Sequence, residues 1–252
     1  MLKHWQIGLV LILLFCLIFN CSKSTRNEND EVIKEPPPVS STPKDNEEAE
    51  LMALCLSGEL VAPDSLYDRI LNDLADIRAS FGDTIEAVTL IEFRAPWVAG
   101  CVMIGFDDTT FQQILDGQYH AWDTLNEQYQ VIQMHTMPIG GSGAVLLIFA
   151  GRLHPRRLAE IYAPLPGVRT THPNGIIGDC PNVYARDTED ELTYLFRNAW
   201  GDCPSGCIYS EYCYFVFEGA QPRLVGHWPA YQGVEAPDWW EEARLNKEHY
   251  CD

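Results

Sequence analysis

The stretch Trp200-Gly201-Asp202-Cys203-Pro204-Ser205-Gly206-Cys207 separates two segments that have the composition of β-strands. Residues 192–197 read LTYLFR and residues 208–217 read IYSEYCYFVF, so both are rich in alternating, aromatic and β-branched side chains. Gly201, Pro204 and Gly206 favour a turn, because glycine tolerates positive φ and proline presets φ. The sequence therefore predicts an antiparallel hairpin, to which residues 223–228 add a third strand.

Cys203 and Cys207 lie inside the predicted turn. A turn brings Cα atoms this close in sequence within disulfide range, so we predict a disulfide between them. The loop-closure model gives so short a loop only about 2 kcal/mol, so the bond fixes the shape of the loop more than global stability. Trp200 and Asp202 then form a candidate ligand loop. The alternative for Asp202 is that it caps the turn by accepting backbone N–H bonds.

The rest of the folded region mixes helices with hairpins. Leu66, Ile70, Leu74 and Ile77 recur at helical spacing and predict a helix over 66–79. We expect further strands at 86–94, 100–104, 131–137, 144–150 and 168–171, and helices at 109–115, 120–129 and 155–162. This order predicts one α+β domain over residues 51–230, with antiparallel hairpins and a split strand-helix-strand segment over 144–171.

Two short motifs carry resemblances to known proteins. Residues 161–168 (IYAPLPGV) resemble the segment of protease propeptide and inhibitor domains in which a helix passes into a strand. This resemblance, confined to those residues, implies a protease inhibitor or propeptide-like domain as an alternative function. The 200–207 element with its aromatic hairpin resembles a family of exported bacterial proteins that carry a Trp-Gly-Asp-Cys-Pro element. That second resemblance implies no particular activity.

The N-terminal region has the pattern of an export signal. Lys3 and His4 precede an apolar run over 7–19, which is short for a membrane span and typical of a secretory signal. The run ends at Ile18-Phe19-Asn20-Cys21, which resembles a bacterial lipobox, although Phe19 and Asn20 stand where the motif usually has small residues. The resemblance implies a lipoprotein signal peptide over 1–20 and acyl chains such as palmitate on Cys21. These would anchor the protein to a bilayer of the bacterial cell envelope. An uncleaved signal anchor and ordinary secretion are the alternatives.

Two segments flank the predicted domain. Residues 21–50 are polar and charged and contain Pro36-Pro37-Pro38, so they predict a disordered tether. Residues 231–252 form a tail with adjacent Trp239 and Trp240, which either pack on the domain or stay exposed for a partner. Cys251 favours packing, because a disulfide at that position would hold the tail in place.

Charge and cysteine content restrict the partners and the compartment. The 36 acidic residues exceed the 17 basic ones and give a net charge of −19, which argues against nucleic acid and anionic lipid surfaces as partners. In an oxidising compartment the cysteines after Cys21 predict a partial disulfide framework with at least one cysteine left over. They are Cys55, Cys101, Cys180, Cys203, Cys207, Cys213 and Cys251.

Motifs for catalysis or metal binding are weak. Cys203, Cys207 and Cys213 with Cys180 or His227 lack the paired two-residue spacing of zinc sites, and the three residues between Cys203 and Cys207 exceed the two of thioredoxin-like enzymes. The acidic stretches at 107–108 and 187–191 lack EF-hand spacing. A hydrolase site lacks the nucleophile elbow, although the chain has Ser142, His135 and Asp107.

We therefore expect no catalytic residue, no metal and no cofactor. The sequence favours a membrane-tethered binding or structural module whose ligand is a protein or a small molecule. The rival hypothesis is a thiol-redox or metal-dependent enzyme that uses the Cys203/Cys207 loop.

Overall fold

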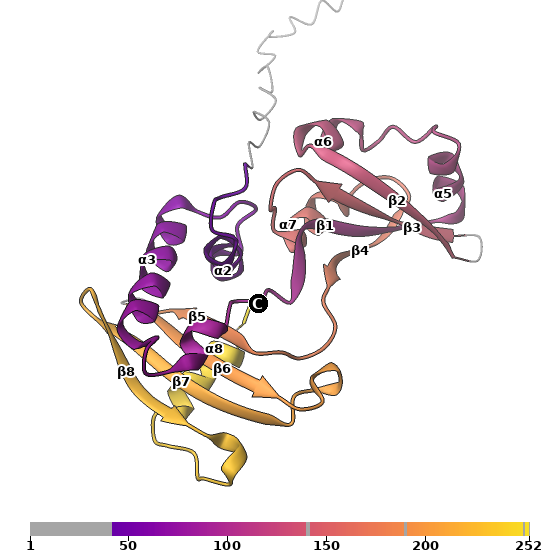
Figure 1. Cartoon of the computed structure of the whole chain (residues 1–252). Coiled ribbons are helices and arrows are strands. Elements are labelled where there is room, and N and C mark those ends of the chain that lie inside the picture. The colour runs from indigo at the N-terminus through magenta and orange to yellow at the C-terminus, as the bar shows by residue number, and fades with distance from the viewer. Residues whose placement is uncertain (1–41, 140–141, 189–190, 249, 252) are drawn as a thin grey trace, which may run out of the picture. The chain divides into compact units, whose positions relative to one another are not determined.

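The computed structural model describes residues 42–139, 142–188, 191–248 and 250–251. All of them belong to one of the two compact units of the chain, Pro38–Asp252. The predicted signal peptide, Cys21 and most of the predicted tether lie outside the described residues. Two four-stranded antiparallel sheets with helices packed on them confirm the predicted α+β class (Figure 1).

Two helices begin the described fold. α2 (Glu47–Ser57) starts where the side chain of Asn46 accepts a hydrogen bond from the Ala49 backbone N–H. Ala49 and Glu50 are buried, so ordered structure begins before the boundary predicted at residue 51. α3 (Asp64–Phe81) covers the predicted helix, and Gly82 is its C-cap.

The strand predicted at 86–94 is wrong. Residues 86–90 form the short helix α4 (Glu86–Leu90), and the chain then continues without regular structure to Pro96. Val88 and Ile91 are almost fully buried in the core with Ile85 packed beside them, which is the three-residue spacing of a helix face. Short apolar runs are ambiguous between helix and strand from periodicity alone, which explains the error.

The first sheet has the order β2-β3-β1-β4. β1 lies between β3 and β4 and is antiparallel to both, so β3, α7 and β4 form the predicted split strand-helix-strand segment. This sheet and its helices form a β-α-β-β-α-β arrangement with α6 as an additional helix. Its elements are β1 (Trp97–Phe106), α5 (Asp108–Leu115), α6 (Asp123–Gln128), β2 (Val131–Ile139), β3 (Ser142–Phe149), α7 (Pro155–Tyr162) and β4 (Val168–Gly175).

Helices cover one face of this sheet. Val102, Ile104 and Leu147 are fully buried there in one hydrophobic cluster with side chains from α5 and α7. Residues on the opposite face, such as Met103 and Leu146, alternate with these and remain partly exposed. The alternation follows from the two-residue period of a strand.

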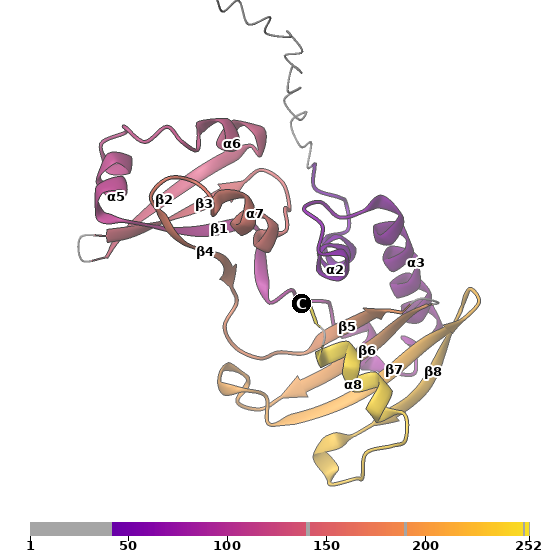
Figure 2. The ribbon, with the colours of Figure 1, turned by 180° about the vertical axis from the view of Figure 1, so that it is seen from behind.

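The second sheet runs in chain order: β5 (Asn182–Asp187), β6 (Leu192–Trp200), β7 (Tyr209–Glu218) and β8 (Gln221–Trp228). β6 and β7 form the predicted hairpin, and β8 adds the predicted third strand. One face packs on α2, α3 and α4 in a large apolar cluster. The other face, with Tyr184, Leu195 and Tyr214, packs on α8 (Trp240–Glu248), which Figure 2 shows lying across these strands.

The C-terminal tail packs on the second sheet. Trp239 stacks on Tyr214 with ring centroids 5.9 Å apart, and Trp240 contacts Tyr212 at 4.6 Å. Cys251 is at disulfide distance from Cys55 in α2, with Cα atoms 4.5 Å apart. This cross-link holds the tail as the sequence suggested. Among the helices formed by the described residues, none has the length and apolar composition needed to cross a membrane.

Candidate functional site

Three aromatic rings meet on the surface at the end of the β6–β7 hairpin. Trp200 pairs with Tyr209 in the strand register, and Tyr231 reaches them from the short helix η2 (Ala230–Gln232). The Trp200 and Tyr231 ring centroids are 4.8 Å apart, and Tyr209 lies 5.9 Å from Trp200 and 6.3 Å from Tyr231. Each of the three residues is 37–43% exposed. We call these three residues the aromatic platform.

The loop beside the platform is held in a tight conformation. Gly201 has φ of 103°, and a Cβ there would lie 3.1 Å from the Ile208 side chain, so glycine is required. Cys203 and Cys207 are at disulfide distance, with Cα atoms 3.9 Å apart. The turn between them includes the short helix η1 (Cys203–Ser205). The predicted pairing of these two cysteines is therefore confirmed.

Asp179 holds this loop to the domain. Its carboxylate accepts two hydrogen bonds from Arg197, at 2.5 and 2.7 Å, and one from the Cys207 backbone N–H at 3.1 Å. The Asp179 backbone N–H donates to the Cys203 carbonyl at 2.9 Å. Both ends of the disulfide loop are therefore hydrogen-bonded to the same residue, Asp179.

The role proposed for Asp202 as a turn cap belongs to Asp179 instead. Asp202 precedes η1, and its side chain makes no capping hydrogen bond there. It is exposed beside the platform. Asp179, in contrast, accepts a hydrogen bond from the Cys207 backbone N–H, 28 residues away in sequence. A cap formed between distant segments has no local sequence pattern, which is why the prediction chose the nearest acidic residue.

The Asp179–Arg197 pair is charged at neutral pH. The hydrogen bonds from Arg197 lower the pKa of Asp179 to about 2, with a further contribution from the Cys207 N–H, against the opposing effect of burial. Arg197 is only 3% exposed and donates also to the Ser210 hydroxyl at 3.0 Å. A buried, fully paired guanidinium therefore supports the base of the loop.

The other cysteines do not join the loop in a metal site. Cys213 is buried in the core of the second sheet, and Cys101 is buried in β1. Cys180, a half-buried free thiol, directly follows Asp179. In the described parts of the chain, no three His, Cys, Asp or Glu side chains are grouped closely enough to hold a metal ion.

The residues considered for hydrolysis have other positions. Asp107 caps α5 by accepting a hydrogen bond from the Thr110 backbone N–H at 2.8 Å. His135 is exposed on β2 opposite Leu146, and Ser142 begins β3. Asp107 therefore has a structural role at the start of α5.

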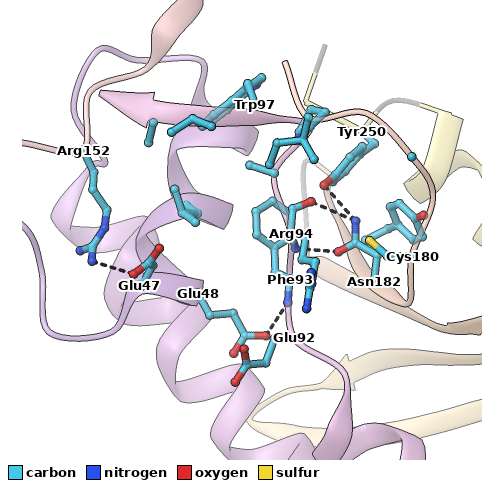
Figure 3. Close-up of a pocket in the computed structure, with 18 of the residues that line it drawn as sticks. Glu47, Glu48, Glu92, Phe93, Arg94, Trp97, Arg152, Cys180, Asn182 and Tyr250 are labelled. Atoms are coloured by element: carbon cyan, nitrogen blue, oxygen red, sulfur yellow. Dashed lines mark hydrogen bonds and ion pairs between the residues drawn. The ribbon is translucent and has the colours of Figure 1, made fainter. Parts of the chain in front are cut away.

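A large cleft lies elsewhere, between α2, residues 92–99 and residues 176–182 (Figure 3). Its volume is about 1040 Å³. The close-up shows Arg94, Trp97 and Asn182 at this junction with acidic residues of α2. Residues 176–180 contribute both to this cleft and, through Asp179, to the disulfide loop.

Most polar groups of the cleft bind one another. Glu48 accepts two bonds from Arg78, at 2.7 and 2.8 Å, and a third from the Phe93 backbone N–H. The Asn182 side chain accepts a hydrogen bond from the Arg94 backbone N–H and donates to the Arg94 carbonyl and the Tyr250 hydroxyl. These bonds fix the connecting segments, so they do not orient a ligand.

Several side chains of the cleft take no part in these bonds: Asp45 and Glu92 are exposed, and Cys180 is a half-buried free thiol. The Trp97 indole N–H is buried and has no hydrogen-bond partner among the described residues, but it is also inaccessible to solvent. Arg94 exposes its side chain at the rim. Because the platform presents three accessible rings in mutual contact, whereas the buried polar groups of the cleft mostly bind one another, the platform is the better candidate site.

Known proteins give no guide to the function of this chain. No family model, curated protein or solved structure matches this chain. Of the platform residues, the sequence identified only Trp200. The strand pattern contained a signal for Tyr209, since hairpin pairing puts it opposite Trp200. Tyr231 had none, because its position depends on how the chain turns after β8.

Proposed function

We propose that the protein is a binding module, held at the bacterial cell envelope through acylated Cys21, and that its aromatic platform binds a basic segment of a partner protein. The observation that carries this proposal is the contact of Trp200, Tyr209 and Tyr231 in an exposed cluster beside a disulfide-closed loop. The following properties of the site support it.

Aromatic side chains suit a protein-binding surface. Tryptophan and tyrosine dominate binding energy at protein interfaces, and their rigid rings lose little conformational entropy on binding. Here the disulfide and the Asp179 contacts hold the neighbouring loop before any ligand arrives. Such preorganisation reduces the free energy needed to order the loop during binding.

Charge favours a basic partner. The net charge of −19 attracts cationic proteins over distance and repels acidic ones. Lysine and arginine side chains bind the faces of tryptophan and tyrosine rings through cation–π attraction. Asp202 stands exposed in the loop that joins the two strands carrying Trp200 and Tyr209 and adds local negative charge.

The proposed compartment has independent support. Cys55 with Cys251 and Cys203 with Cys207 are at disulfide distance, and such pairs persist outside the reducing cytosol. Labelling cells with a radioactive fatty acid tests the anchor. We expect label in the native chain and none in a Cys21→Ala variant; equal label in both contradicts acylation of Cys21.

The binding proposal is tested with defined peptides and the full chain in detergent. An arginine-rich peptide and a glutamate-rich peptide of equal length are titrated by calorimetry. We expect binding of the basic peptide only, and a loss of about tenfold in affinity for Trp200→Ala, equivalent to about 1.4 kcal/mol. Ile177→Ala is the matched control, because Ile177 is an apolar residue that is 97% exposed and outside the platform.

Two results would contradict the proposal. Equal weakening by Trp200→Ala and Ile177→Ala would mean that the platform has no special role. Binding that survives Trp200→Ala unchanged would assign the effect to net charge alone. Thiol titration separates the module from the rival enzyme: we expect Cys203 and Cys207 to be unreactive without reductant, whereas a reactive thiolate there supports thiol-redox chemistry.

Protease inhibition is a second candidate function. It is favoured by the split strand-helix-strand topology of β3, α7 and β4, in which the inhibitor-like residues 161–168 join α7 to β4. Because a fold alone does not determine function, this candidate depends on its test. The chain is added to serine, cysteine and metalloproteases. Slowed cleavage of a reporter peptide supports inhibition, and unchanged rates in all three classes contradict it.

A further inference from the structure

β2 has an exposed outer edge. It is the terminal strand of the first sheet, where only β3 pairs with it among the described residues. Residues 132–136 are all exposed, with Ile132 at 66% and Met134 at 47%. The backbone groups on the outer side of an edge strand are available to a further strand.

The composition of β2 distinguishes it from the other edge strands of the two described sheets. β2 reads VIQMHTMPI and contains no Asp, Glu, Lys or Arg. Natural edge strands usually carry charge or proline, which prevents pairing with another chain. β2 has only Pro138, near its end, whereas the others contain Arg169 and Pro173 in β4, Arg186 and Asp187 in β5, and Pro222 and Arg223 in β8.

The lack of acidic residues extends across the first sheet. Its four strands contain no Asp or Glu, although the chain has 36 of them. Two copies of a chain with a net charge of −19 repel each other wherever carboxylates meet. The strands of the first sheet add no carboxylate to a contact at the β2 edge, so the edge suits a second copy of the same chain.

We propose that two copies of this chain pair through their β2 strands, antiparallel across a two-fold axis. The result is one continuous sheet with four strands from each copy. A strand of nine residues presents an edge of roughly 30 Å. Such an interface is isologous, so each β2 residue near the axis faces a residue of the same strand in the partner.

Side chains support the same pairing. The strand registers place His135, Leu146, Met103 and His172 in one row across the sheet. The row has an apolar centre and contains no carboxylate. In the dimer the row continues into the second copy without an opposed pair of carboxylates. The pairing therefore avoids the like charges directly opposite each other that destabilise a sheet.

The test uses lysine substitutions in the full chain, dissolved in detergent and measured by analytical ultracentrifugation. Gln133→Lys and Thr136→Lys, which lie on opposite faces of the sheet, each add a lysine from both copies to the paired edge and should weaken the dimer at least about tenfold. Both substitutions lower the net negative charge of the chain. General repulsion between copies would therefore decrease, and only a local effect at the edge can explain dissociation. Ile177→Lys makes the same charge change at a fully exposed site away from β2 and should leave the dimer intact.

Three outcomes would overturn the inference. The first is a native chain that remains monomeric at concentrations up to about 100 μM, because even a weak dimer with a dissociation constant in that range would then form. The second is a dimer that both β2 variants retain, since the interface would then lie elsewhere. The third is dissociation by Ile177→Lys to the same degree, which would assign the effect to charge in general.

Discussion

Removal of the Cys55–Cys251 cross-link should destabilise the fold far more than removal of Cys203–Cys207. The first bond joins residues 196 positions apart, and the second joins residues four apart. In the loop-closure model a disulfide lowers the conformational entropy of the unfolded chain, and the resulting stabilisation grows with the logarithm of the loop length. The model gives about 5 kcal/mol for the long loop and about 2 kcal/mol for the short one.

The environment of the long-range bond adds to this difference. Cys55 is 5% exposed and Cys251 is 2% exposed, so the bond lies in the core beside α2. A typical domain has a free energy of unfolding of about 5–15 kcal/mol, so losing about 5 kcal/mol removes a large fraction of it. The variant Cys55→Ala/Cys251→Ala should therefore be near its unfolding threshold at 37 °C.

Urea unfolding measures this effect. The double variants Cys55→Ala/Cys251→Ala and Cys203→Ala/Cys207→Ala are compared with the native chain by circular dichroism, and their midpoints are converted with the slope of the transition. We expect losses that differ by about 3 kcal/mol. Equal losses, or a larger loss for the short loop, would refute the loop-length argument. Adding reductant to the native chain should reproduce the sum of the two effects.

Three further measurements test individual contacts. Asp179→Asn should lower the free energy of unfolding by about 2–3 kcal/mol, which is less than for a fully buried pair because 33% of the Asp179 side chain is exposed. Because the pKa of Asp179 is held at about 2, this stabilisation is present above about pH 4 and should be lost between about pH 4 and pH 2. Acid unfolding of the variant should not show this loss. Burial, with a smaller effect of the nearby Arg156 and Arg157, lowers the pKa of His154 to about 4. The free energy of unfolding should therefore fall by about 3 kcal/mol as the pH drops from about 6.5 to about 4. NMR titration of the ring should find it neutral above about pH 5. Asn246→Ala removes fully buried hydrogen bonds from α8 to Thr193 and should destabilise by about 2 kcal/mol, with faster hydrogen exchange in α8 than in β6.

Local patterns predicted much of the fold. α3 followed from apolar residues at helical spacing, and the β6–β7 hairpin followed from alternating strands around a glycine- and proline-containing turn. The Cys203–Cys207 pair was predictable because the turn itself brings the two residues together. Each of these features is determined by residues close in sequence.

Contacts between distant segments were not predictable in the same way. The Cys55–Cys251 pair was one of many combinations open to seven cysteines, and only the packing of α2 against the tail selects it. Arg197 is a polar residue in an apolar strand, and its partner Asp179 lies in a loop before β5, so no local pattern connects the two. The platform depends similarly on η2, which brings Tyr231 to the hairpin. Helix α4 was missed for a different reason, since a single turn is too short for periodicity to separate from a strand.

The long-range disulfide imposes an order on the maturation of the chain. Cys55 must wait for 196 further residues before its partner is synthesised. Five other cysteines emerge in that interval, and Cys101 comes first. Strictly vectorial oxidation, in which each thiol joins the next to arrive, would trap Cys55 with Cys101. Correct maturation therefore needs β1 to bury Cys101 before oxidation, or an isomerase to reshuffle mispaired intermediates.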